Sequence, residues 1–312
     1  MAHDRRFRFG VQVAEAASND SWIALARRAE DLGYSSLMMP DHFGAQLAPF
    51  PALTAAASAT TDLRVGALVM CNDYRHPVVH AKEMATLDIL AEGRTEWGIG
   101  AGWMNTDYEQ SGIPHDTARV RITRMEEAVR VMKGLFADAA LDHEGEHYQI
   151  TGLDGQPKPI QKPHPPLLIG GGGRRVLTIA GREADIVGLA PSATTGAVDA
   201  TSARDAAADR TEKKLAWVKE AAGERFADIE LNVLIFAAIV TDDRDGMAET
   251  IGGAFGLPPE DALEVPHALL GSVEEICETL EQRRDRWGIS YVVVQGPAME
   301  AMAPVVAKLA GT

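Results

Sequence analysis

Two residues that can hold or exchange a proton, Asp41 and His42, stand side by side in the segment SSLMMPDHF (35–43), directly after an apolar run. Histidine changes its charge near neutral pH, so His42 at the rim of a pocket is a candidate general acid or base. Asp41 would face the opposite way on an extended strand. Two ordinary alternatives stay open, because Asp41 can cap a turn and His42 can be a surface histidine.

Four consecutive glycines, 170–173, end one predicted strand and open a predicted helix at Arg174. Glycine lets the backbone approach an anion closely, and the N–H groups at a helix start can hold a phosphate. Gly171, Gly172, Gly173 and Arg174 are therefore candidate phosphate-binding residues. The alternative is a tight strand-to-helix turn, for which one glycine would suffice.

Further candidates follow other predicted strands. Gly100 and Gly102 would let a flat ligand lie against a strand end, and Ala190 follows another strand. Trp103 could line a substrate pocket or belong to the core. Glu109 could face the substrate, although its spacing does not prove this.

These candidates are positioned by eight β-rich runs that alternate with helical ones. Such alternation predicts an α/β fold, the (β/α)₈ TIM barrel with insertions, whose sites lie at the C-terminal ends of the strands. A doubly wound open sheet is the alternative, but no G-x-G-x-x-G follows the first strand. The predicted strands are 7–13, 35–39, 63–70, 95–100, 166–170, 184–189, 229–240 and 289–295.

The pattern predicts a single domain over 1–312, with insertions near 103–117, 138–165 and 190–228. The first insertion, 103–117, is expected to be irregular. The charged residues within 204–225 are expected to form the solvated face of a helix.

Composition narrows the class of protein. The net charge of −15 and the pI near 5.0 argue against nucleic acid and anionic membranes as partners, because such partners need Lys and Arg. Cys71 and Cys277 are far apart, and H-E-x-x-H is absent, so we expect neither a disulfide framework nor a metal site. No signal peptide or long apolar run is visible. A cytoplasmic enzyme with a small-molecule substrate is predicted.

Several segments together resemble the luciferase-like monooxygenase superfamily over about residues 7–310. They are PDHF, RVGALVMCNDYRHP, AEGRTEWGIGAGW, LLIGGGGRRVLTIAGREADIVGLAP and WGISYVVV, in that order. The resemblance implies a bacterial luciferase-like barrel that uses FMN or the deazaflavin coenzyme F420, and it implies a homodimer. The Asp-His pair is similar to that of the F420-dependent branch.

The resemblance also implies roles for individual residues. His42 would be the acid or base near the reactive C5 of the deazaflavin, and Asp41 would help to hold the ring. Gly172 and Gly173 would bind the coenzyme phosphate. The peptide between Leu68 and Val69 would be a non-prolyl cis peptide against the ring.

Two positions depart from the F420-dependent dehydrogenases of this family. Trp103 stands where they have glutamate, and Gln46 stands where they have tryptophan. Reduction of a C=C, C=N or C=O bond in a fairly apolar substrate is therefore favoured over oxidation of a sugar phosphate or simple alcohol. The alternatives are an FMN-dependent monooxygenase, which uses O₂ and reduced flavin from a partner reductase, and a non-catalytic deazaflavin-binding protein.

Overall fold

The computed structural model describes residues 5–192, 196 and 200–312, and its strand order is that of the predicted (β/α)₈ barrel. The chain divides into two compact units, which we describe separately. Unit 1 comprises Met1–Val13, Arg28–Ser36 and Ile169–Thr312, and unit 2 comprises Ala14–Arg27 and Leu37–Leu168. The assignment of 1–312 to one domain, with three insertions, stays a prediction.

The parallel strands β2, β3, β4 and β5 belong to unit 2. Val65 of β3 lies opposite Thr95 of β5, and Met70 of β4 lies opposite Ile99 of the same strand. The strand predicted over 63–70 is thus present as two pieces. Along this part of the chain lie α1 (Asn19–Asp31), β2 (Ser36–Met39), α2 (Pro49–Ala59), β3 (Arg64–Ala67), β4 (Met70–Cys71), a 3₁₀ turn (Asn72–Tyr74), α3 (Pro77–Leu90), β5 (Thr95–Gly100), α4 (Asn105–Ser111), α5 (Ala118–Phe136) and the hairpin β6 (Leu141–Glu144) and β7 (Gln149–Leu153).

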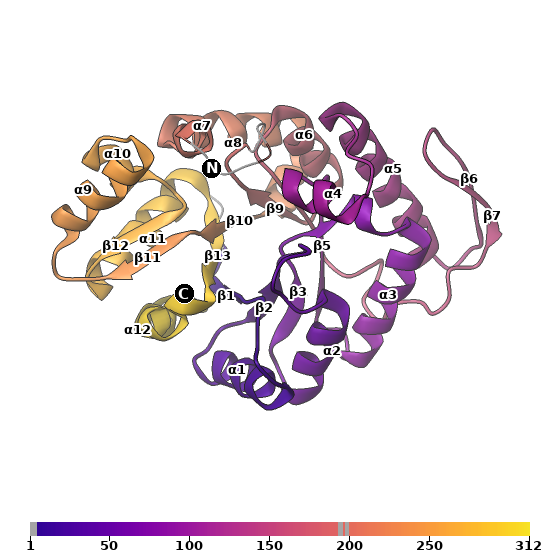
Figure 1. Ribbon diagram of the computed structural model, residues 1–312, viewed down its shortest axis with the longest axis horizontal. Coiled ribbons are helices and arrows are strands. Elements are labelled where there is room, and N and C mark those ends of the chain that lie inside the picture. The colour runs from indigo at the N-terminus through magenta and orange to yellow at the C-terminus, as the bar shows by residue number, and fades with distance from the viewer. Residues whose placement is uncertain (1–4, 193–195, 197–199) are drawn as a thin grey trace. The chain divides into compact units, whose positions relative to one another are not determined.

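Unit 1 holds neighbouring parallel strands in the order β1, β13, β10, β9, β8. β11 pairs with β12 in a separate two-stranded sheet, beside which α9 and α10 lie (Figure 1). The single strand predicted over 229–240 is therefore wrong: β10 and β11 belong to different sheets. The elements are β1 (Arg8–Gln12), β8 (Leu167–Gly171), α6 (Arg174–Glu183), β9 (Ile186–Leu189), α7 (Ala200–Asp205), α8 (Ala208–Ala222), a 3₁₀ turn (Gly223–Asp228), β10 (Glu230–Ile235), β11 (Ala237–Val240), α9 (Arg244–Phe255), α10 (Pro259–Glu264), β12 (Ala268–Gly271), α11 (Val273–Trp287), β13 (Ile289–Gln295), a 3₁₀ turn (Gly296–Ala298) and α12 (Met299–Leu309).

Local sequence explains where α11 and β13 begin and end. The Ser272 hydroxyl accepts a hydrogen bond from the N–H of Glu275, whose carboxylate accepts one from the N–H of Ser272. This capping box starts α11, and Gly288, with φ +80°, ends it in the left-handed conformation that suits glycine. The strand that follows, ISYVVVQ, is buried over all but its last residue, as a parallel strand covered on both faces should be.

Among the helices of the described ranges, none has both the length and the apolar character needed to cross a lipid bilayer. The longest, α5, illustrates this, because its sequence ARVRITRMEEAVRVMKGLF carries charges along its whole length.

Candidate active site

The acid after β2, Asp41, is buried and fully engaged by the protein. Its carboxylate accepts two hydrogen bonds from the guanidinium of Arg75, at 2.6 and 3.2 Å, and one from the N–H of Cys71, at 3.0 Å. These bonds join the end of β2 to β4 and to the loop before α3. Asp41 therefore fixes the backbone that carries the neighbouring candidates, and Arg75 takes part through its ion pair with Asp41.

His42 is only partly buried, with 26% of its side chain exposed, and its Nδ1 lies 2.6 Å from Oδ2 of Asp107. The same carboxylate accepts hydrogen bonds from the hydroxyl of Tyr74, at 2.9 Å, and from the N–H of Phe43, at 3.2 Å. Burial raises the pKa of Tyr74, so its hydroxyl keeps its proton and donates. A carboxylate that serves as acceptor places the His42 proton on Nδ1 and leaves Nε2 available.

Asp107 reaches His42 because 105–111 is the helix α4, in a segment that the sequence predicts to be irregular. Gly102, with φ +76°, turns the chain into it, and an added Cβ there would lie 1.9 Å from the hydroxyl of Tyr108. Gly112, also at φ +76°, ends the helix. Packing thus accounts for glycine at 102, where the sequence suggests room for a flat ligand.

A second set of buried polar groups supports α4. The Tyr108 hydroxyl donates to Asp73 at 2.9 Å and lies 3.7 Å from the Cys71 sulfur. Arg124 of α5 binds Asp73 at 2.9 Å and Asp116 at 2.8 Å. Burial raises the pKa of the Cys71 thiol to about 12, so this cysteine is a protonated packing group at neutral pH.

The structure separates the two predicted substrate-pocket residues. The Trp103 ring packs edge-to-face on His42, with ring centroids 5.8 Å apart, so these two side chains are brought together. Glu109 is exposed on α4, two residues after the buried Asp107 that faces His42. The geometry therefore supports Trp103 as a neighbour of the acid–base group and gives no such support to Glu109.

The predicted cis peptide is confirmed: the Leu68–Val69 bond is cis, and neither residue is proline. It lies between β3 and β4, and the Leu68 N–H donates to the carbonyl of Met39 at the end of β2, at 2.8 Å. Both side chains are half-buried. Gly100 ends β5 opposite Cys71, so it is adjacent to this strand end.

In unit 1 the predicted phosphate-binding glycines differ from one another. A Cβ at Gly171 would lie 2.6 Å from a methyl of Val176, and one at Gly172 would lie 2.4 Å from the carbonyl oxygen of Ala190. Gly173 has φ −86°, and no described atom lies within 4 Å of the position of its added Cβ. Packing requires the first two glycines, whereas the fold gives no reason for glycine at 173.

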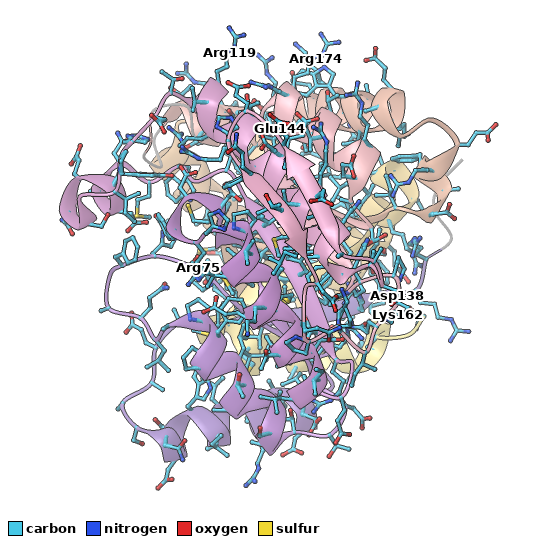
Figure 2. The ribbon with its side chains drawn as sticks, turned by 90° about the vertical axis from the view of Figure 1, so that its right-hand side faces the viewer. Arg75, Arg119, Asp138, Glu144, Lys162 and Arg174 are labelled. Carbon is cyan, nitrogen blue, oxygen red and sulfur yellow. The ribbon has the colours of Figure 1, made fainter. Side chains whose placement is uncertain are left out.

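The other two candidates of this unit contribute differently from one another. The Arg174 side chain projects outward (Figure 2), is 66% exposed, and lies 3.6 Å from Glu220. Its backbone N–H, at the start of α6, is the part that fits the predicted role, since Gly173 at the cap position of that helix has no side chain that could accept a hydrogen bond. Ala190 donates its N–H to the carbonyl of Gly171 and accepts a hydrogen bond from the ammonium of Lys214.

Sequence reasoning missed several residues of these networks, among them Asp107, Tyr74 and Lys214. The one usable signal for Asp107 was Gly112, because a glycine stop predicts a helix that ends there. The partner of His42 is 65 residues away in the chain, and no local pattern specifies such a pair.

The sequence model of the luciferase-like monooxygenase family matches residues 6–287. Among curated relatives, the FMNH(2)-dependent dimethylsulfone monooxygenase of Pseudomonas putida is 30% identical over 131 residues, which cover 42% of this chain and 36% of that protein. The F420-dependent glucose-6-phosphate dehydrogenase of Nakamurella multipartita is 28% identical over 302 residues, covering 91% and 83%. The chain matches several other curated relatives over only about half of their length.

Among solved structures, the coenzyme F420-dependent tetrahydromethanopterin reductase of Methanopyrus kandleri matches with a TM-score of 0.78 and 20% identity. The match covers 98% of this chain and 99% of that one. At this identity the likeness speaks for the fold. With nine tenths of its length matched by one family model, the chain belongs to the luciferase-like monooxygenase family.

Proposed function

We propose that this protein is an F420-dependent oxidoreductase that transfers a hydride between C5 of the deazaflavin and a small, fairly apolar organic substrate. Relatives named as F420-dependent dehydrogenases support the coenzyme, and one of them aligns over 91% of this chain. The observation that carries the proposal is the anchored, partly exposed His42.

The chemistry at His42 follows from its contacts. Asp107 and Tyr74 hold the ring and keep the Nδ1 proton in place, so Nε2 is the atom that exchanges a proton with the substrate. In a reduction, the ring would also carry a proton on Nε2 and would donate it to the substrate, which then gains one hydride and one proton, while the Asp107 carboxylate would stabilise the imidazolium. Trp103 adds an apolar contact to the ring, on which it packs edge-to-face. A bound deazaflavin would carry a hydride on carbon and transfer two electrons without readily reacting with oxygen.

The residues of unit 1 fit the coenzyme phosphate. Gly173 caps the start of α6, and no described atom lies within 4 Å of the position of its added Cβ. Glycine there is explained by a ligand that approaches the backbone closely. We assign the phosphate to Gly172, Gly173 and the backbone N–H of Arg174, and we propose that Leu68 and Val69 contact the ring.

The substrate class follows from Trp103 and Gln46. Trp103 places an apolar ring beside His42, and Gln46 uses its side-chain amide to bind the carbonyl of Pro40 at 3.2 Å. The site therefore lacks the glutamate and the tryptophan that the F420-dependent dehydrogenases of the family carry at positions 103 and 46. We therefore propose reduction of a C=C, C=N or C=O bond as the reaction.

An FMN-dependent monooxygenase is the second candidate, and the Pseudomonas putida relative named for FMNH(2) favours it. This activity would consume O₂ and would need a partner reductase. A protein that only binds the deazaflavin is the third candidate, and the anchored His42 argues against it. We further propose that the protein acts in the cytoplasm as a homodimer, which light scattering of the purified chain would test.

The proposal is tested by incubating the protein with reduced F420 and a panel of enones, imines and ketones. Oxidation of the coenzyme that depends on both protein and substrate supports it. Binding of F420 without turnover on any substrate favours the binding protein. Oxygen uptake with reduced FMN, and none of these activities with F420, favours the monooxygenase.

A further inference from the structure

A lysine that the sequence pattern places on a solvated helix face is buried in unit 1. Lys214 of α8 is 3% exposed. Its ammonium donates to the carbonyl oxygen of Ala190 at 3.0 Å and to that of Asp205 at 2.6 Å, and it lies 2.7 Å from Oδ2 of the Asp205 side chain. An ammonium has three protons, so every donor is used. Burying such a charge is unfavourable unless it is paired, and here the Asp205 carboxylate and two backbone carbonyls pair it.

The backbone that Lys214 and Asp205 hold is the turn after β9. Lys214 binds the carbonyl of Ala190, and the N–H of Ser192 donates to the Asp205 carboxylate at 2.7 Å. The N–H of Ala190 in turn donates to the carbonyl of Gly171 on β8, at 3.1 Å. We call Lys214 and Asp205 the clamp, because together they hydrogen-bond to both ends of the 190–192 turn.

The clamped turn lies directly against Gly172. The Cβ position of Gly172 is 2.4 Å from the Ala190 oxygen, 2.5 Å from the Ser192 nitrogen and 2.6 Å from the Pro191 carbonyl carbon. Two backbones thus touch with no side chain between them. A shift of the 190–192 turn therefore moves Gly172, and with it the start of α6.

We infer that Lys214 is a positioning residue for the coenzyme phosphate, acting through the 190–192 turn on the backbone of Gly172 and Gly173. This inference rests on the proposed binding of the phosphate by those glycines. Lys214 itself does not touch the coenzyme, because its three donors are taken by Ala190 and Asp205.

The test compares Lys214→Met with Lys213→Met, which alters the exposed lysine that precedes Lys214 in the same helix. Deazaflavin fluorescence gives the Kd for F420, and steady-state kinetics give KM and kcat. We expect Lys214→Met to weaken F420 binding about ten- to hundredfold, the scale of hydrogen bonds to a charged group. Its kcat at saturating coenzyme should stay at the wild-type value, and Lys213→Met should bind F420 normally.

Two further variants test the same turn by changing Asp205, the acidic residue of the clamp. Asp205→Asn keeps an oxygen that can accept from the N–H of Ser192 and from Lys214, whereas Asp205→Ala removes it. We expect Asp205→Asn to retain most of the F420 affinity that Asp205→Ala loses. If Lys214→Met does not fold, this pair decides the matter, and equal affinities of the two variants overturn the inference.

Other outcomes separate this inference from the function on which it rests. Wild-type protein that does not bind F420 contradicts the proposed function. Normal F420 binding by a folded Gly173→Val variant contradicts the phosphate assignment. An unchanged Kd in folded Lys214→Met, or a fall in kcat alone, overturns only the role of the clamp.

Discussion

The strand ends of unit 2 and the glycine turn of unit 1 are built in different ways. In unit 2, the side chains that follow β2 are held by hydrogen bonds to charged partners: Arg75 binds Asp41, and Asp107 binds His42. In unit 1, the turn after β8 is bare backbone, packed at Gly172 against another stretch of backbone. The first region presents a side chain that can move a proton, and the second presents N–H groups that can hold an anion.

This contrast indicates how each region should fail. A site made of side chains is lost when a charge or a proton donor is removed. A site made of backbone is lost when a side chain is added. Substitutions that remove a side-chain group in unit 2 should therefore reduce turnover or stability. Substitutions that add a side chain at a glycine of unit 1 should reduce coenzyme binding.

The largest effect is expected from His42→Ala. A positioned acid or base contributes about 10²–10⁴-fold to turnover, so kcat should fall by that factor while the Kd for F420 stays close to the wild-type value. Asp107→Asn should cause a smaller loss, because it weakens the hold on Nδ1 and keeps the imidazole. Wild-type turnover by His42→Ala, on any substrate that the enzyme converts, would make His42 a structural residue.

The next effect concerns stability and comes from Arg75→Met. Asp41 has 4% of its side chain exposed, and this substitution leaves its carboxylate without its guanidinium partner. Breaking a buried ion pair from one side costs about 3 kcal/mol or more. Urea unfolding should show a loss of this size, whereas Lys82→Met, at an exposed position of α3, should show little change. Equal midpoints for the two variants would mean that Arg75 does not hold the β2 end.

Paired valine substitutions probe the glycine turn. Gly173→Val adds a side chain where no described atom lies within 4 Å, at a backbone conformation that valine adopts readily, so the melting temperature should stay unchanged. We expect its Kd for F420 to rise about tenfold or more, through loss of charge-assisted hydrogen bonds. Gly172→Val must displace the 190–192 backbone and should lower stability by about 1–3 kcal/mol. The opposite pattern would place the phosphate elsewhere.

The last effect is a pH dependence of stability, for which each unit contributes one buried histidine. Burial lowers the pKa of His80 to about 3 and that of His267 to about 4, whereas an unfolded histidine has a pKa near 6.5. Below about pH 6.5 the unfolded chain therefore binds protons that the folded chain does not. The free energy of unfolding should fall as the pH drops from 6.5 towards 4, by about 1.4 kcal/mol per pH unit for each histidine.

Substitution of one buried histidine at a time measures how much each contributes to the pH dependence of the free energy of unfolding. His80→Gln and His267→Gln should each reduce the slope of unfolding free energy against pH by about 1.4 kcal/mol per pH unit between 4.5 and 6. His76→Gln, at an exposed histidine, serves as the control and should keep the wild-type slope. Slopes that match the wild type in both buried variants would contradict the lowered pKa values.

The sequence predicted the barrel and most of its elements because these depend on local patterns. β5 and β13 have the predicted bounds, and α6 starts at the predicted Arg174, since apolar runs and flanking glycines mark these ends. The strand over 229–240 was wrong because one apolar run serves two sheets, and the partner of its second half, β12, comes from far along the chain. Apolar character alone does not tell which sheet a segment joins.

The candidate site was predictable in its backbone and less so in its contacts. Glycines 171–173 were visible in the sequence, and the family resemblance implied the cis peptide at Leu68–Val69, which the structure confirms. Asp107 was hidden because pairing with His42 depends on how α4 folds over the strand ends. Lys214 was hidden because burial of a charged residue is decided by tertiary partners, not by the surrounding composition.

Coenzyme choice is the central claim, and a parallel titration of the purified protein with F420 and with FMN tests it most directly. Absorbance near the deazaflavin band and native mass spectrometry report binding of each coenzyme without requiring a substrate. Our account predicts a saturable F420 complex with a lower Kd than that of any FMN complex. Tight FMN binding together with no detectable F420 binding would contradict it.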